Sequence, residues 1–350
     1  MFELRKKINR LKIKLGYRLR LSKAISMPKF ITIDPTNHCD LKCPLCPTGV
    51  GDKSVEYGLL KLDQFKEVVD GISKWAQTLS IYSWGEATLN KSFIDMIRYS
   101  SQNPHKIRST TCLNLNHVTD EQIKGLITSN LDILNISIDG ITQEVYEKYR
   151  VGGNLKTVFN NLKKLIAAKE LYKSKTRIQW AFIVFKHNEH QVEEAKVMAK
   201  GFGIPIEIKE AMPDIKGVLH GSIEAMIDTH GEWLPDNPKY NPYDMKNKKR
   251  KSEFKYNAGT RKIVNKHSKP VTFCKRPWQL TFINWNGDVF PCGCVHTEEQ
   301  HRMGNVFQED FKDIWNGEKY VAARKELLDQ PNSLKTICHT CKENGFFTTM

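Results

Sequence analysis

The chain alternates between strand-like and helix-like segments six times between residues 29 and 208. Short apolar or β-branched runs are each followed by a longer segment with apolar residues at helical spacing. Parallel strands joined by helical crossovers account for such a repeat, so we expect an α/β open sheet or partial barrel. The predicted strands are 30–33, 79–82, 107–112, 133–138, 178–185 and 204–208; the predicted helices are 62–72, 93–99, 120–128, 143–149, 155–169 and 189–200.

Eight of the nine cysteines fall into two groups, and only Cys112 is isolated. The N-terminus lacks the apolar stretch of a secretory signal and no apolar run has the length of a membrane span, so we expect a cytoplasmic protein. Disulfides are rare in that compartment, and the grouping therefore indicates metal binding. The first group is Cys39, Cys43 and Cys46; the second is Cys274, Cys292, Cys294, Cys338 and Cys341.

The formal net charge of +15 is concentrated in two segments. Residues 1–29 carry +9 and residues 240–269 carry +8, which leaves −2 for the rest. A nearly neutral body argues against nucleic-acid binding and favours local attraction for something anionic. Residues 4–21 form a predicted basic amphipathic helix, for which two interpretations remain open. Either its apolar residues dock on the body and its lysines face water, or it contacts an anionic membrane surface or lipid-linked substrate.

The first cysteine group has the spacing C-x3-C-x2-C and directly follows the first predicted strand. Three thiolates on one short loop can bind three corners of a [4Fe–4S] cluster and leave the fourth iron open to a small molecule. Structural zinc would need a fourth ligand, which the adjacent His38 could supply. The spacing and its place after a first strand favour the iron–sulfur cluster.

This combination resembles the radical S-adenosylmethionine (SAM) superfamily. The resemblance implies a partial (β/α)6 barrel over residues 28–210. It also implies that SAM binds the open iron, that the reduced cluster cleaves SAM to a 5′-deoxyadenosyl radical, and that a donor such as flavodoxin or ferredoxin supplies electrons. The SAM-binding residues that it implies are Gly85, Glu86, Ser137, Asp139, Arg150 and Asn188. Asp139 has an equal alternative as the cap of the next helix, and Gln179 is a candidate catalytic residue if it points into the barrel.

The second group, with Cys274 and Cys292 followed by the pair Cys338 and Cys341, resembles the SPASM/twitch extension of this superfamily. Four thiolates would close a second [4Fe–4S] cluster, and the count resembles the single-auxiliary-cluster form, as in 2-deoxy-scyllo-inosamine dehydrogenase. A zinc ribbon is the alternative for this module. Cys294 is either a spare buried thiol, a replacement ligand or a catalytic residue that faces the substrate.

Four regions are therefore expected: a basic helix at 1–27, the barrel at 28–210, a basic linker or lid at 211–270, and the Cys-rich domain at 271–350. We expect an oxidoreductase that dehydrogenates a carbohydrate, cyclitol or lipid-linked glycan. Within the same superfamily, an epimerase or a peptide-modifying enzyme is the alternative. A zinc-containing nucleic-acid-binding protein is the alternative from another class. Peripheral contact with the inner membrane surface is the expectation attached to the N-terminal helix.

Overall fold

The computed structural model describes residues 2–53, 55–102, 107–211, 228–241, 254–257, 262–265, 274–293 and 299–343. Six strands in chain order lie parallel to one another at its centre. They are β1 (Phe30–Ile33), β2 (Thr78–Ile81), β3 (Arg108–Leu113), β4 (Ile133–Ser137), β5 (Arg177–Val184) and β6 (Ile206–Glu210). The six predicted strands and their parallel arrangement are thus confirmed.

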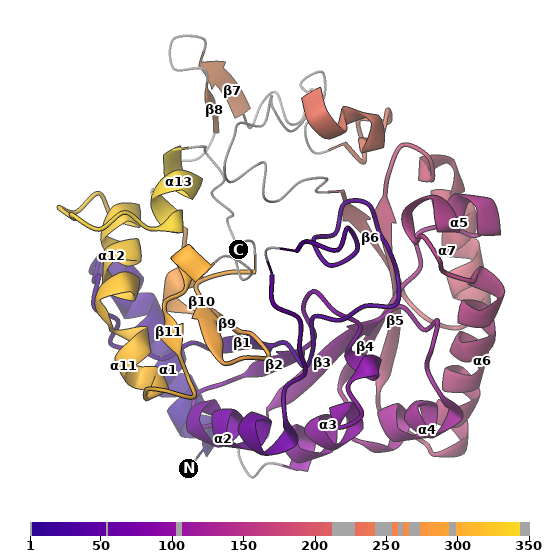
Figure 1. Ribbon diagram of the computed structural model, residues 1–350, viewed down its shortest axis with the longest axis horizontal. Helices are drawn as coiled ribbons and strands as arrows, with labels where there is room; N and C mark the ends of the chain where they lie inside the picture. The colour runs from indigo at the N-terminus through magenta and orange to yellow at the C-terminus, as the bar shows by residue number, and fades with distance from the viewer. Residues whose placement is uncertain are drawn as a thin grey trace.

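The helices between the strands all lie on the outer side of the curved sheet, and its inner side is left open (Figure 1). These helices are α2 (Leu62–Ile72), α3 (Phe93–Gln102), α4 (Asp120–Thr128), α5 (Gln143–Tyr149), α6 (Leu155–Leu171) and α7 (Val192–Gly201). Local sequence fixes their starts: Thr119 and Gln122 form a capping box on α4, and Asn154 caps α6. The architecture is the expected partial (β/α)6 barrel.

Side chains along each strand alternate between the helices and the barrel interior. The Trp180 ring on β5 lies 5.9 Å from that of Phe159 on α6, so Gln179 and Ala181 point inward. Strand register carries this face across the sheet, because aligned residues of neighbouring strands share a face. The interior is largely polar, with Thr32, Ser80, Thr110, Cys112, Asn135, Ser137, Gln179, Glu207 and Lys209 facing inward.

The C-terminal region extends the same sheet. Strand β9 (Leu280–Ile283) pairs parallel with β1, and β10 (Asp288–Phe290) and β11 (Gly304–Asn305) add antiparallel strands beyond it. A tight turn joins β9 and β10, with Gly287 at φ +86°. Helices α11 (Phe311–Trp315), α12 (Glu318–Leu327) and α13 (Ile337–Glu343) complete this region. The Cys-rich module is therefore joined to the barrel edge by a strand ladder.

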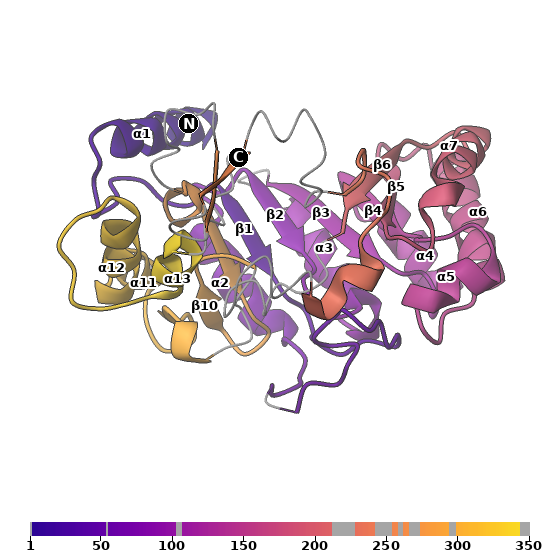
Figure 2. The same ribbon diagram turned by 90° about the horizontal axis from the view of Figure 1, so that it is seen from above.

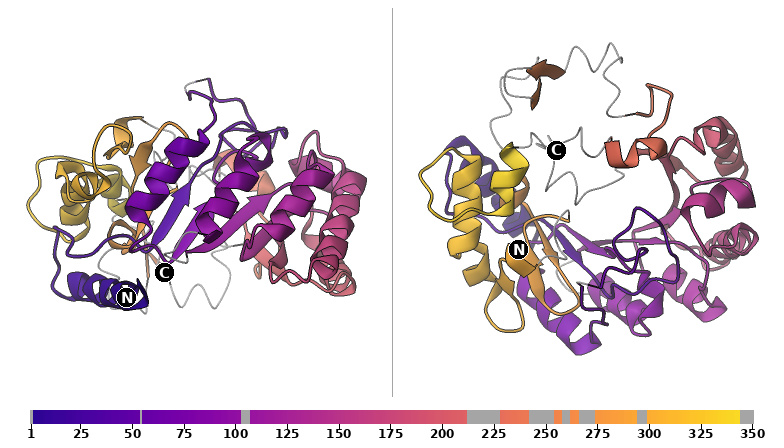
Figure 3. Two further views of the ribbon diagram at one scale, coloured as in Figure 1. Left: turned by 90° about the horizontal axis from the view of Figure 1, so that it is seen from below. Right: turned by 45° about the horizontal axis from the view of Figure 1, so that its top comes forward.

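Helix α1 (Phe2–Arg18) lies on the outside of the molecule, away from the open side of the sheet (Figures 2 and 3). The expected linker at 211–270 contains a short helical turn at Gly231–Trp233 and an antiparallel hairpin of β7 (Phe254–Asn257) and β8 (Lys262–Asn265). Its basic run at 246–251 lies outside the described residues. Among the helices that the structure describes, none is long and apolar enough to cross a membrane.

Candidate active site

The first three cysteines lie together on the loop that follows β1. Cys43 is buried and Cys39 and Cys46 are partly buried, and the Cys46 amide donates to the Cys43 carbonyl at 3.1 Å. Leu41, Tyr149 and Phe185 pack around them. Burial raises the pKa of the Cys39 thiol to about 12 and also raises that of Cys43. A bound metal centre would favour the ionised thiols here by offsetting their desolvation.

The donor set of this loop fits an iron–sulfur cluster. It offers three sulfurs from one turn, whereas the ring of His38, the candidate fourth zinc ligand, packs against Tyr57 at 5.6 Å. Across the described residues, no three His, Cys, Asp or Glu side chains converge on the position of a single metal ion. Thiolates are the usual protein ligands of [4Fe–4S] clusters, and Cys39, Cys43 and Cys46 are the residues that would hold one here.

The turn that follows β2 packs directly on the cysteine loop. A Cβ atom added at Gly85 would lie 2.1 Å from the Thr36 carbonyl oxygen and 2.6 Å from that of His38. The amide of Glu86 donates to the same His38 oxygen at 2.8 Å. Gly85 is thus required for backbone approach, and the predicted SAM-binding pair Gly85-Glu86 lies beside the predicted cluster ligands.

The Glu86 carboxylate is buried and fixed by two donors. It accepts from the Asn114 amide at 2.8 Å and from the Thr88 hydroxyl at 2.8 Å. Burial raises its pKa to about 7. Asp40, next to Cys39, shares this environment because its carboxylate accepts from the Asn114 side chain at 2.7 Å. A cation placed here would favour the ionised form of Glu86, which agrees with its predicted role toward the SAM ammonium group.

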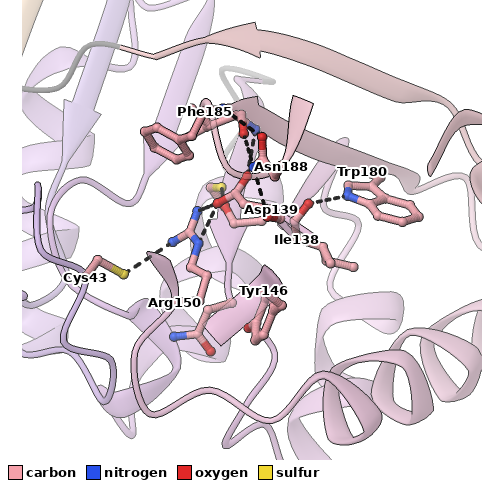
Figure 4. Close-up of polar contacts among 12 residues, drawn as sticks. Cys43, Ile138, Asp139, Tyr146, Arg150, Trp180, Phe185 and Asn188 are labelled. Carbon is pink, nitrogen blue, oxygen red and sulfur yellow. Dashed lines mark hydrogen bonds and ion pairs between the residues drawn. The ribbon is translucent and has the colours of Figure 1, made fainter. Parts of the chain in front are cut away.

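Asp139 and Arg150 form a buried ion pair next to the cysteine loop (Figure 4). The Arg150 Nε and Nη2 atoms both lie 2.6 Å from Asp139 Oδ2, and Asp139 Oδ1 accepts from the Ile183 amide at 2.6 Å. The alternative that Asp139 caps the next helix is wrong, because Thr142 is the N-cap residue of α5. Arg150 Nη1 lies 3.9 Å from Cys43 Sγ, which places the pair beside the predicted cluster and SAM positions.

Asn188 is committed to the main chain. Its side-chain amide donates to the carbonyls of Asp139 at 3.0 Å and Ile183 at 2.9 Å, and its oxygen accepts from the Phe185 amide at 2.7 Å. The expected contact with SAM through the donors of this side chain is therefore not supported by the geometry. The reason is that the turn after β5 buries main-chain groups that need partners. Asn188 therefore fixes the C-terminal end of β5, where the Ile183 amide donates to Asp139 (Figure 4).

Ser137 and Gln179 both face the barrel interior, but each has a protein partner. Ser137 Oγ lies 3.1 Å from the Sγ of Cys112, a residue to which the sequence assigned no role. Gln179 Nε2 donates to Glu207 Oε2 at 3.0 Å, and Lys209 Nζ lies 3.5 Å from the same carboxylate. The prediction that Gln179 points inward is confirmed, whereas its catalytic role stays a prediction. Cys112, Glu207 and Lys209 also face the barrel interior, because strand register places them on the same face of the sheet as Ser137 and Gln179.

An aromatic cluster beside the cysteine loop was not predicted. The rings of Tyr149, Phe185 and Trp233 lie 4.3 to 5.9 Å from one another. Trp233 belongs to the segment expected to be a linker, and its carbonyl accepts from the Lys186 amide at 3.0 Å. These rings cover the side of the loop that carries Cys43 and Cys46. No motif spacing announces such a cluster, because its members come from three separate segments.

The second cysteine group also gathers in space. Cys274 and Cys338 are buried and Cys292 and Cys341 are partly buried. Burial, followed by the neighbouring thiols of Cys341 and Cys274, raises the pKa of Cys338. Four thiolates are the number that closes an iron–sulfur cluster, and Cys274, Cys292, Cys338 and Cys341 are the residues that would hold one here. Cys294, the candidate catalytic thiol, lies outside the described residues.

Arg324 on α12 is a fully buried cation next to this group. Its Nε donates to the Pro277 carbonyl at 2.9 Å, and the rings of Trp315 and Tyr320 flank the guanidinium at 4.6 and 5.1 Å. Burial lowers the pKa of Arg324 to about 9, and the neighbouring Tyr320 and Cys338 oppose that shift. Its Nη2 has no partner among the described residues. An unpaired donor so deeply buried suits a site that holds negative charge.

Two family models match the chain. The radical SAM superfamily model matches residues 33–196, and the iron–sulfur cluster-binding SPASM domain model matches residues 274–342. Among curated relatives, the AdoMet-dependent heme synthase of Methanosarcina barkeri is 24% identical over 329 residues, which cover 90% of this chain and 88% of the synthase. The tungsten-containing aldehyde ferredoxin oxidoreductase cofactor-modifying protein of Pyrococcus furiosus is 24% identical over 340 residues, which cover 89% of this chain and 87% of that protein.

Solved structures share the fold. BtrN in complex with AdoMet and 2-DOIA matches with a TM-score of 0.52 and 16% identity over 87% of this chain and 88% of BtrN. Streptococcus suis SuiB bound to its precursor peptide SuiA matches with a TM-score of 0.60 and 15% identity over 89% of this chain and 70% of SuiB. The barrel and the cysteine loop thus define a radical SAM enzyme, and the chain belongs to that superfamily. Within it, the chain is a member with a C-terminal SPASM domain, and its cofactors are [4Fe–4S] clusters and SAM.

Proposed function

We propose that this enzyme is a radical SAM oxidoreductase that dehydrogenates a carbohydrate, a cyclitol or a lipid-linked glycan. When bound at Cys39, Cys43 and Cys46, the cluster supplies the electron that cleaves SAM to a 5′-deoxyadenosyl radical, which takes hydrogen from a substrate C–H bond. In this proposal Glu86 pairs with the SAM ammonium group. Arg150, oriented by Asp139, keeps positive charge beside the loop.

The second thiol group carries the proposal of oxidation. A substrate radical becomes a two-electron-oxidised product when it loses one more electron and releases a proton to water, and a closed cluster held by Cys274, Cys292, Cys338 and Cys341 would accept that electron. This group is attached to β9 and β10, in the same sheet as β1. A cytoplasmic donor such as flavodoxin or ferredoxin would supply the first electron.

The polar barrel interior supports the proposed substrate class. Hydroxyl, amide and charged side chains line the face where a substrate would lie, whereas the opposite faces of the same strands bury aliphatic side chains. Such a lining matches a polyhydroxylated ring better than an apolar one. The BtrN complex with 2-DOIA supports this class, whereas SuiB binds a peptide, so peptide modification remains the competing substrate class.

The test is an anaerobic assay of reconstituted enzyme with SAM, dithionite and a panel of cyclitols, sugars and peptides. We expect 5′-deoxyadenosine together with a carbohydrate or cyclitol product that has lost two hydrogens. The Cys338→Ala/Cys341→Ala variant should still form 5′-deoxyadenosine and lose the oxidised product. Peptide turnover with no turnover of any cyclitol or sugar would contradict the proposed substrate class.

A second candidate, an epimerase, is favoured by Cys112. Its thiol lies in the barrel interior, 3.1 Å from Ser137 Oγ, and burial raises its pKa so that it keeps its hydrogen. Such a thiol can return a hydrogen atom to a substrate radical, after which one electron from the donor protein and one proton from water restore it. In D2O an epimerase would place deuterium in a product of unchanged oxidation state, and Cys112→Ser would abolish that product. A dehydrogenase would release an oxidised product and tolerate Cys112→Ser.

A further inference from the structure

Helix α1 presents three distinct faces. One face is buried against the body and includes Lys6, Asn9, Ile13 and Gly16. A second face is apolar and exposed: the side chains at helical spacing, between 43% and 65% exposed, are Leu4, Ile8, Leu11, Leu15 and Leu19, here called the leucine stripe. The interpretation that these residues dock on the barrel is therefore wrong. Polar and small residues make the docking contact instead.

Specific contacts fix the rotation of the helix. The Asn9 side chain both donates to and accepts from the main chain of Met27, each at 2.9 Å. The Tyr17 ring packs edge-on against Trp278 at 5.8 Å, and its hydroxyl donates to the Lys275 carbonyl at 3.2 Å. These contacts lie on the opposite side of the helix from the leucine stripe, so the stripe faces away from the body. Helix α1 itself lies at the periphery of the molecule (Figures 2 and 3).

The third part of the helix surface is basic and consists of two rows, one on each side of the leucine stripe. At 100° per residue, one row lies beside Leu11 and the other beside Ile8. All six side chains are exposed: Lys7, Lys14 and Arg18 lie in the row nearest Leu11, Arg10 lies further round the same side, and Arg5 and Lys12 lie in the opposite row. Glu3 is the single acidic residue of the helix sequence. An apolar stripe between basic rows is the arrangement of helices that lie in a membrane interface.

We propose that α1 docks the enzyme on an anionic lipid bilayer, with the leucine stripe in the acyl boundary and the basic rows on lipid phosphates. Lys and Arg side chains can extend from the edges of such a stripe to the headgroups. A second copy of this chain fits less well, because pairing two stripes would bring two sets of six cations together. This proposal does not depend on the reaction that the enzyme catalyses.

The test is co-sedimentation of the full-length protein with vesicles of phosphatidylcholine, alone or with an equal part of phosphatidylglycerol, at low and high salt. We expect binding to the mixed vesicles that weakens with salt. Leu11→Asp/Leu15→Asp should reduce vesicle partitioning at least about tenfold, and Lys7→Gln/Lys14→Gln should weaken it and flatten its salt dependence. The matched control is Leu171→Asp on α6, a leucine that is 74% exposed and outside α1.

Several outcomes would overturn the proposal. The first is that wild-type protein stays in the supernatant with both vesicle types. The second is that Leu11→Asp/Leu15→Asp partitions to the vesicles as the wild type does. A third is a dimer, seen by light scattering, that Leu11→Asp/Leu15→Asp makes monomeric, since the stripe would then join two copies. Circular dichroism and iron content confirm folding, and Leu11→Ser/Leu15→Ser serves as a milder variant if the aspartates unfold the helix.

Discussion

Single residues around the cysteine loop are held by polar contacts away from solvent, and the Asp139–Arg150 ion pair is one of them. Asp139 is fully buried, and its two oxygens accept from Arg150 and from the Ile183 amide. Asp139→Ala would leave a buried guanidinium unpaired, and we expect a loss of about 3–5 kcal/mol in the free energy of unfolding. Denaturant unfolding checks this.

The matched control is the exposed pair of Asp95 and Arg98, which lie 3.0 Å apart on α3. Asp95→Ala should change the free energy of unfolding by at most about 1 kcal/mol. If the two variants lose the same free energy of unfolding, the buried Asp139–Arg150 pair contributes no more to stability than an exposed pair, which would contradict the prediction.

Asp34 predicts a pH dependence of stability. It is buried at the end of β1, its Oδ1 has no partner among the described residues, and burial raises its pKa from 3.8 to about 8. The folded state therefore binds one proton more than the unfolded state between these values. Stability should fall as pH rises across this window, by at most about 1.4 kcal/mol per pH unit from this group.

Asp34→Asn removes this proton linkage. Thermal unfolding of reconstituted protein at about pH 6 and about pH 8 should show that the stability of the variant, relative to that of the wild type, increases as pH rises. Parallel behaviour of the two proteins would mean that Asp34 ionises normally in the fold.

The roles of some single residues could be predicted from the sequence, and the roles of others could not. The cysteine ligands could be assigned because their spacing is local and their chemistry narrow. Asn188 and Trp233 could not, because their roles depend on which main-chain and ring atoms meet them across the fold. The spacing that resembled a SAM contact at Asn188 instead satisfies buried carbonyls.

At the scale of elements, the turn after β2 sets the position of the cysteine loop. Gly85→Ala would place a Cβ against two main-chain oxygens of that loop, so we expect the iron content to fall by about half while the second site stays loaded. Gly71→Ala on α2 is the control, because no atom lies within 4 Å of its added Cβ. Iron analysis and electron paramagnetic resonance measure the two sites, and full iron content in Gly85→Ala would contradict this prediction.

Helix α12 brings Arg324 to the second thiol group, and its charge should favour the reduced form of a cluster there. We expect Arg324→Met to lower the midpoint potential by at least about 59 mV, a tenfold change in a one-electron equilibrium. A redox titration followed by electron paramagnetic resonance, in a protein with Cys39, Cys43 and Cys46 replaced by Ala, isolates this site. Arg324→Lys, which keeps the charge, should move the potential less, and an unshifted potential in Arg324→Met would contradict the assignment.

Elements were predicted well where periodicity decides them. The bounds of α2, α4 and α5 agree with the sequence prediction, and α2 and α4 each bury an apolar stripe. The pairing of β9 with β1 was not predicted, because partners more than 240 residues apart leave no local pattern. The sequence left two orientations of α1 open for a related reason: its docking contact uses Asn9 and Gly16, which hydropathy does not mark as buried.

For the whole molecule, the nine-stranded order makes the C-terminal module part of the barrel. Removing residues 274–350 would expose the β1 edge along Phe30–Ile33 and strip Trp278 from α1. An unpaired edge of this kind promotes aggregation. We expect the truncated chain to be insoluble or aggregated in size-exclusion chromatography where the full chain is not. A monomeric, folded fragment would show that the module is an independent domain.

The same ladder has a consequence for electron flow. Strand β1 leads into one thiol group. Its neighbour β9 and the next strand, β10, are flanked by Cys274 and Cys292 of the other group. Their separation is therefore set by hydrogen-bonded strands about 4.8 Å apart rather than by a hinge between lobes. Electron tunnelling between centres mounted in this way needs no diffusive closure, and its rate should not change when glycerol or sucrose thickens the solvent.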